Sequence, residues 1–129
     1  MTFYSDHMTD EEFVSLAAEF KVSNLDKSLV FYKEILDFEV YRIDKKNKHA
    51  TLKFNGAFLM IKEDMRLTSG KERSDFFVRF IVSNLENYYD KVKSKGARIL
   101  FPLEKMSYGV KRFYVQDLDK YQLKFCEKL

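Results

Sequence analysis

The chain has 129 residues, 46% of them hydrophobic with 13 Phe and 8 Tyr, so it is long enough to form one domain with a sizeable core. The net charge of +3 arises from 23 basic and 20 acidic residues that are interspersed, which argues against a nucleic-acid-binding protein. Short apolar runs, a polar N-terminus unlike a signal peptide and the single Cys126 predict a cytoplasmic protein without membrane segments.

The first half of the chain alternates between strand and helix patterns. Thr9-Asp10-Glu11-Glu12 fits a capping box and predicts a short helix through about Leu16. Beyond it, apolar residues recur first at the spacing of a half-buried strand and then at that of a helix, and Asn55-Gly56 predicts a hairpin turn. The expected elements are a strand at 18–22, a helix at 25–36 and strands at 38–43, 50–54 and 58–62.

The same order returns in the second half. The tetrapeptide Val-Ser-Asn-Leu occurs at 22–25 and again at 82–85, which indicates an internal repeat. Here the expected elements are a strand at 76–82, a helix at 85–95 closed by Gly96, and strands at 97–100, 111–115 and 121–126. The chain is thereby divided into an N-terminal extension (1–16), a first βαβββ module (17–63), a linker (64–75) and a second βαβββ module (76–128).

Four stretches, VSNLDKSLVFYKEILDFEV, KSKGARI, SYGVKRFYV and DLDKYQLKF, resemble the vicinal oxygen chelate superfamily. This superfamily includes glyoxalase I, bleomycin-resistance proteins and extradiol dioxygenases, and the resemblance extends from Ala17 to Glu127. It implies an α+β fold in which two tandem modules form a curled mixed sheet around a cavity, with the helices outside. It also implies a homodimer. The sequence departs from the family pattern at Asp37 and Lys120, where glycine is usual.

In metal-dependent members of this superfamily, four ligands lie on the first and last strand of each module. The resemblance places these ligands at Ala17, Met60, Phe77 and Lys124, none of which suits a divalent ion. A shift of two residues along the first strands would present Glu19 and Arg79, which adds only one ligand. His7 and His49 are expected to be ordinary surface residues. We therefore expect no metal and no other cofactor.

Strand alternation indicates which side chains face the cavity. The candidate ligand-binding residues are Glu19, Phe58, Met60, Phe77, Arg79, Tyr108, Arg112, Tyr114 and Lys124. Structural alternatives stand beside them: Glu19 could pair with Arg79, the aromatic residues could fill a core or a dimer seam, and Tyr108 could simply pack in its loop. Lys124 either pairs with Glu19, binds an anionic or carbonyl-bearing ligand, or faces another way.

These observations favour a metal-free small-molecule-binding protein of sequestering or resistance type. Because the candidate charges lean positive, a neutral or anionic aromatic ligand is expected rather than cationic bleomycin. The alternative is a superfamily enzyme of the glyoxalase, lyase or dioxygenase kind with a non-standard site, with Glu19 or Tyr114 as acid–base. No Ser-His or Cys-His arrangement supports nucleophilic catalysis, and catalytic residues remain unassigned. A third possibility is a structural or regulatory module whose cavity is filled.

Overall fold

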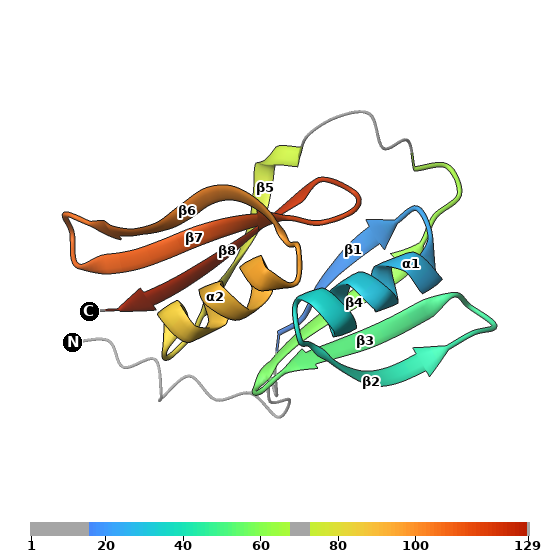
Figure 1. Ribbon diagram of the computed structural model, residues 1–129. Helices are drawn as coiled ribbons and strands as arrows, with labels where there is room; N and C mark the ends of the chain where they lie inside the picture. Colours follow the sequence, from blue (N-terminus) through green and yellow to red (C-terminus); the bar gives the residue numbers. More distant parts are fainter. Residues whose placement is uncertain (1–15, 68–72, 129) are drawn as a thin grey trace, which may run out of the picture.

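Each half of the chain forms a four-stranded sheet with one helical segment against it (Figure 1). The computed structural model describes residues 16–67 and 73–128. The expected helix before residue 16 lies outside this part. The elements are β1 (Ala18–Val22), α1 (Leu25–Val30), η2 (Phe31–Ile35), β2 (Glu39–Asp44), β3 (His49–Phe54), β4 (Ala57–Glu63), β5 (Arg73–Ile81), α2 (Leu85–Ser94), β6 (Arg98–Met106), β7 (Val110–Gln116) and β8 (Tyr121–Lys128).

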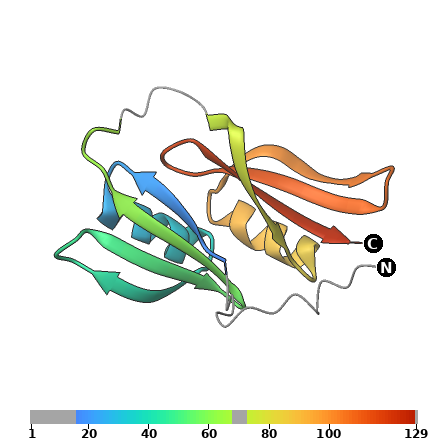
Figure 2. The ribbon, with the colours of Figure 1, turned by 180° about the vertical axis from the view of Figure 1, so that it is seen from behind.

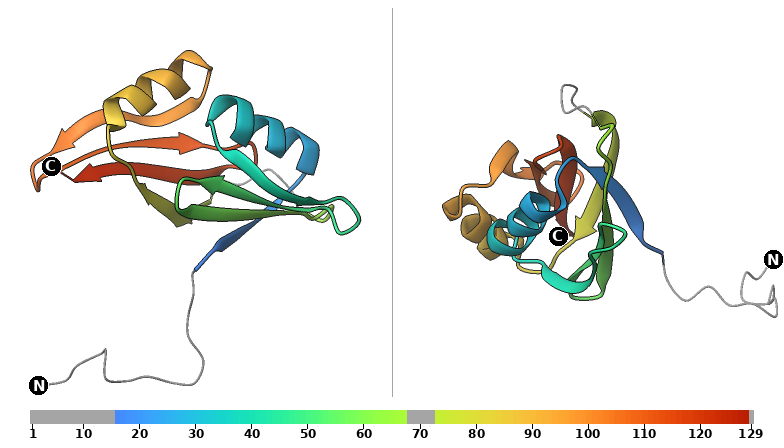
Figure 3. Two further views of the ribbon diagram at one scale, coloured as in Figure 1. Left: turned by 90° about the horizontal axis from the view of Figure 1, so that it is seen from below. Right: turned by 90° about the vertical axis from the view of Figure 1, so that its right-hand side faces the viewer.

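The strand order is β1-β4-β3-β2 in the first sheet and β5-β8-β7-β6 in the second. In both sheets the first strand pairs in parallel with the last, and the other pairs are antiparallel. The predicted α+β fold with two tandem βαβββ modules is therefore confirmed. Viewed from below, α1 and α2 lie side by side on the same side of the two sheets (Figure 3), and the view from behind shows the strands in front of the helices (Figure 2).

The core lies between the helices and the sheets, and strand alternation produces it. On β1, Phe20 and Val22 are buried whereas Glu19 and Lys21 are exposed. The last strands follow the same rule: Leu59 and Ile61 are buried on β4, and Leu123 and Phe125 on β8. The faces opposite the helices are therefore open, and they carry the side chains that the sequence predicted to face a cavity.

Hydrogen bonds and rings hold the two modules together. The Tyr32 hydroxyl donates to Asp117 Oδ2 at 2.6 Å, and the Tyr88 hydroxyl donates to the Leu36 carbonyl at 2.8 Å. The rings of Phe38 and Phe80 meet edge to face at 5.5 Å. Because these contacts are buried, they fix how the two sheets sit relative to one another.

Two strands extend three residues or more beyond a predicted bound. β5 begins at Arg73, inside the predicted linker, and β6 continues past Leu100 to Met106. Pro102 lies within β6, although proline cannot donate a hydrogen bond within a sheet. It is accommodated because β6 is an outer strand with a free edge.

The two departures from the family pattern both occupy left-handed backbone positions. Asp37 has a φ of 63° and Lys120 a φ of 67°, where glycine would be unstrained. Gly96, which follows α2, has a φ of 90°, as expected for a glycine that ends a helix. None of the described helices is sufficiently long and apolar to cross a bilayer.

Candidate functional site

The open face of the second sheet contains a hollow of about 450 Å³. It is formed by β5, β7, β8 and the turn before β7. Its lining residues are Arg79, Ile81, Tyr108, Val110, Arg112, Tyr114 and Cys126. Gly109, with a φ of 83°, allows the sharp turn that places Tyr108 at the hollow. The lining is mostly apolar and aromatic with two arginines, which is the make-up of a small-molecule site.

Arg112 is the most unusual side chain of this hollow. Its Nε and Nη1 atoms are buried, and neither has a hydrogen-bond partner within the described part of the chain. The guanidinium carbon lies 4.8 Å from the centre of the Tyr114 ring and 5.2 Å from that of Phe101. These rings hold the cation by cation–π contact but do not accept its in-plane hydrogen bonds. Two donors are therefore left for a ligand or water to satisfy.

Lys124 brings a second cation to the same face. Its Nζ lies 3.5 Å from the centre of the Phe77 ring and 4.6 Å from that of Tyr114. The register places Lys124 directly beside Tyr114 and Arg79, its neighbours on β7 and β5. Lys124 therefore neither pairs with Glu19 nor turns away from this face. Its ammonium group lies over two aromatic rings.

The Cys126 thiol lies within the electrostatic influence of three positive charges. Burial raises the pKa of this thiol, while the positive charges of Arg79, Lys124 and Arg112 each act to lower it. The thiol is only 6% exposed. Since the net pKa shift is upward, the group is a neutral thiol at pH 7 rather than a reactive thiolate. The hollow is therefore a positively charged site, and its described lining includes no Asp or Glu.

Three of the nine predicted residues lie on the other sheet. Glu19 contacts His49 Nε2 at 3.1 Å and Lys21 Nζ at 3.6 Å, so its ionic partners come from its own sheet rather than being Arg79. His49, which was expected to be an ordinary surface residue, is thus a partner of the Glu19 carboxylate. Met60 lies beside Glu19 on β4, and the Phe58 ring meets the Tyr41 ring edge to face at 5.6 Å.

The other six predicted residues come together on the second sheet. Four of them line the hollow, and Phe77 and Lys124 are joined to it through Tyr114. Sequence reasoning missed Val110 and Phe101 because both lie just outside the strands expected there. Ile81 and Cys126 could have been included, because their alternation already places them on the open face.

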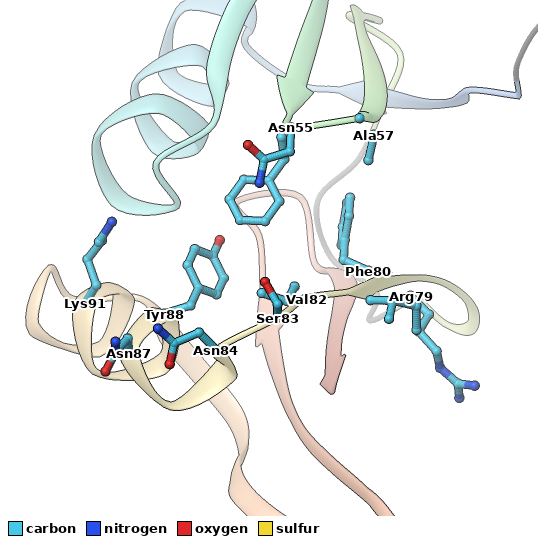
Figure 4. Close-up of a pocket in the computed structure, with 13 residues that line it drawn as sticks. Asn55, Ala57, Arg79, Phe80, Val82, Ser83, Asn84, Asn87, Tyr88 and Lys91 are labelled. Atoms are coloured by element: carbon cyan, nitrogen blue, oxygen red, sulfur yellow. The ribbon is translucent and has the colours of Figure 1, made fainter. Parts of the chain in front are cut away.

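A second hollow, of about 550 Å³, lies between the modules (Figure 4). The β3–β4 turn lines one side, and the end of β5 with the start of α2 lines the other. Asn55 and Ala57 come from the turn and face Phe80, Val82 and Ser83, while Tyr88 and Lys91 close the helix side. No local sequence pattern predicts this hollow, because the hollow depends on how the two modules pack.

The family model for the Glyoxalase/Bleomycin resistance protein/Dioxygenase superfamily matches residues 15–125. The chain belongs to this superfamily. No curated protein sequence matches the chain.

Solved structures share the fold at low sequence identity. The bleomycin resistance determinant encoded on transposon Tn5 has a TM-score of 0.76 at 19% identity, covering 90% of this chain and 98% of that one. TioX from Micromonospora sp. ML1 has a TM-score of 0.73 at 19% identity, covering 88% and 98%. A glyoxalase/bleomycin resistance protein/dioxygenase from Alicyclobacillus acidocaldarius has a TM-score of 0.73 at 20% identity, covering 88% and 90%.

The metal-ligand positions of this superfamily do not suit a metal in this chain. Lys124 carries a positive charge, and Phe77, which lies against it, has no donor atom. Ala17 has none either, and Met60 offers only a thioether. Among residues 16–67 and 73–128, no three His, Cys, Asp or Glu side chains gather where they could hold an ion. The residues at these positions therefore do not fit a divalent metal ion.

Proposed function

We propose that this superfamily member is a metal-free protein of the cytoplasm that binds and sequesters a small aromatic molecule, neutral or anionic, in the hollow of the second sheet. The observation that carries the proposal is Arg112, whose Nε and Nη1 donors are buried beside the hollow without a partner. Buried donors that lack a partner are costly, and a ligand acceptor removes that cost.

The size and lining of the hollow support an aromatic ligand. Its volume of about 450 Å³ falls in the range of small-molecule sites, which is roughly 300–1,000 Å³. Tyr108 and Tyr114 offer ring faces, and Ile81 and Val110 add apolar surface. A planar ring can therefore be stacked and desolvated at once.

The charges favour an acceptor group on that ring. Arg79, Arg112 and Lys124 surround Cys126, and together they attract a carboxylate, a phenolate or a polarised carbonyl. A guanidinium binds planar oxyanions through two parallel hydrogen bonds, which lysine cannot do. A cationic ligand such as bleomycin would be repelled.

We further propose that the protein is a homodimer in which a second copy covers part of this open face. Large apolar side chains are exposed there: Ile81 is 72%, Tyr108 70% and Phe101 47% exposed. A contiguous apolar surface of this kind is unusual on a monomer. Light scattering coupled to size exclusion tests this, and a monomeric mass at micromolar concentration would contradict it.

Titration calorimetry with 2-naphthoate and the neutral 2-naphthol tests the binding function. We expect the wild-type protein to bind at least one probe, and Arg112→Gln to weaken naphthoate binding by about 10- to 100-fold, because a charged hydrogen bond contributes about 1.5–3 kcal/mol. The matched control is Arg42→Gln, since Arg42 is exposed on β2. Equal affinity of Arg112→Gln and the wild type, or no binding of either probe below millimolar concentration, would refute the proposal.

Elemental analysis of the purified protein tests the metal-free part separately. We expect no divalent metal at stoichiometric level, and one metal ion per chain that resists dialysis would overturn this part of the proposal.

A further inference from the structure

The two modules are related by a repeat that also aligns their last strands. Leu59 of β4 pairs with the first residue of β1, and Leu123 of β8 pairs with Val78, the corresponding residue of β5. Two positions before these leucines, Ala57 and Tyr121 are the first residues of β4 and β8. Ala57 and Tyr121 are therefore equivalent positions of the two modules.

The Tyr121 side chain covers the outer edge of β1, the edge that is not paired with β4. Its ring stacks on Phe20 with centroids 4.0 Å apart and planes 6° apart. Its hydroxyl accepts the Lys21 N–H at 3.1 Å and donates to the Lys21 carbonyl at 2.9 Å. Two residues earlier, the carboxylate of Asp119 accepts the Ser23 N–H at 3.1 Å. A phenol and a carboxylate thus occupy the backbone groups that an edge strand leaves unpaired.

The equivalent edge of β5 meets smaller side chains. Ala57 stands where Tyr121 stands in the other module, and Asn55 stands in place of Asp119. The Val82 N–H donates a hydrogen bond to the Cys126 carbonyl of β8. The backbone N–H and carbonyl of the neighbouring Ile81 therefore point toward the outer edge of the sheet, away from β8. β5 is an outer strand, and no other strand pairs with this edge within the described chain.

The hollow between the modules lies at this edge. Ala57 lies on one side of it and Phe80 and Ser83 on the other (Figure 4), and Ile81 also lines it. Phe80 is the counterpart of Phe20, against which the Tyr121 ring stacks. The space that a phenol ring fills in one module is therefore open in the other.

We propose that this hollow is a second binding site, specific for a phenolic small molecule. The ligand's hydroxyl takes the place of the Tyr121 hydroxyl, accepting the Ile81 N–H and donating to the Ile81 carbonyl, and its ring packs between Ala57 and Phe80. Phenol suits this edge because one atom both donates and accepts, whereas an ether or a carboxylate leaves the carbonyl without a donor. The site shares Arg79 and Ile81 with the Arg112 hollow but no other lining residue, and it does not depend on the function proposed there.

Amide NMR of the full chain with p-cresol and 4-methylanisole tests this site. The two probes differ by one methyl group, which removes the donor. We expect p-cresol to shift the amides of Asn55 and Ser83, which do not line the Arg112 hollow, together with that of Ile81, which lines both. Its dissociation constant should be about three- to tenfold lower than that of 4-methylanisole, because the ether has lost one hydrogen bond. Equal affinities, or p-cresol shifts confined to residues around Tyr108 and Tyr114, would overturn the proposal. This wild-type measurement is decisive without any variant.

Ala57→Tyr adds a second test, because it supplies the ring from the chain itself. We expect this variant to lose the p-cresol shifts at Ser83, and Ala57→Phe to lose them as well. Arg112→Gln, which alters the other hollow, is expected to keep them. A folded Ala57→Tyr variant that binds p-cresol at Ser83 as tightly as the wild type would refute the assignment of the ring position.

Discussion

Replacing Tyr121 by Phe tests whether the hydroxyl that spans the two modules stabilises the fold. The ring remains, so its stacking on Phe20 is kept, and only the hydrogen bonds to the backbone of Lys21 are lost. Each such bond contributes about 0.5–1.5 kcal/mol. Tyr121 is 7% exposed, but the Lys21 side chain is open to solvent, so water can replace part of the loss. We expect the free energy of unfolding to fall by about 1–2 kcal/mol.

Urea denaturation followed by far-UV circular dichroism measures this change, because the chain contains no Trp to serve as a fluorophore. With a slope of about 1–2 kcal/mol/M, the midpoint should fall by about 0.5–2 M without a change of slope. The protein concentration must be equal in all samples, because the apparent stability of a self-associating protein depends on its concentration. The matched control is Tyr41→Phe, because Tyr41 is 58% exposed. If Tyr121→Phe loses no more stability than this control, the hydroxyl does not contribute as argued.

Three further predictions concern the core and the module interface. Tyr32→Phe removes the 2.6 Å donor to Asp117 and is expected to cost about 1–3 kcal/mol in urea; a cost below about 0.5 kcal/mol would contradict this. Burial raises the pKa of Asp117 from 3.8 to about 6, so the folded state holds a proton that the unfolded state has released. Stability should therefore fall as pH rises from about 4 to 6 and then level off, and Asp117→Asn should flatten this slope; an unchanged slope in urea titrations across this range would argue against it. Leu123→Ala should lower the free energy of unfolding by about 2–5 kcal/mol, because Leu123 is fully buried. Leu118→Ala, at a half-exposed position, should lower it by well under half of that. Equal losses would show that burial is not the cause.

The order of elements was predictable because it depends on short-range periodicity. The strand pattern before each Val-Ser-Asn-Leu tetrapeptide and the helix pattern after it correspond to β1 and α1 in the first half and to β5 and α2 in the second. The bounds of β5 and β6 were not predictable in the same way. The strand at 98–106 contains Pro102, which is compatible with a sheet only at an outer position, and strand order is not a local property.

The candidate site was predictable as a face but not as a set of contacts. Alternation correctly separated Arg79, Arg112 and Lys124 from the buried residues beside them. It could not tell that Glu19 pairs with His49 of β3, because that contact depends on the pairing of three strands in the first sheet. The alternative in which Glu19 pairs with Arg79 is accordingly not found among the described residues.

By itself, the amino-acid sequence determined the repeat, the fold class and the side of each strand on which a residue lies, because these follow from periods of two and 3.6 residues. Strand register and module packing decided the rest. Register places Lys124 beside Tyr114, and packing sets Tyr121 against one strand edge while Ala57 leaves the equivalent edge open. Such distances join residues far apart in the chain, and no local pattern encodes them.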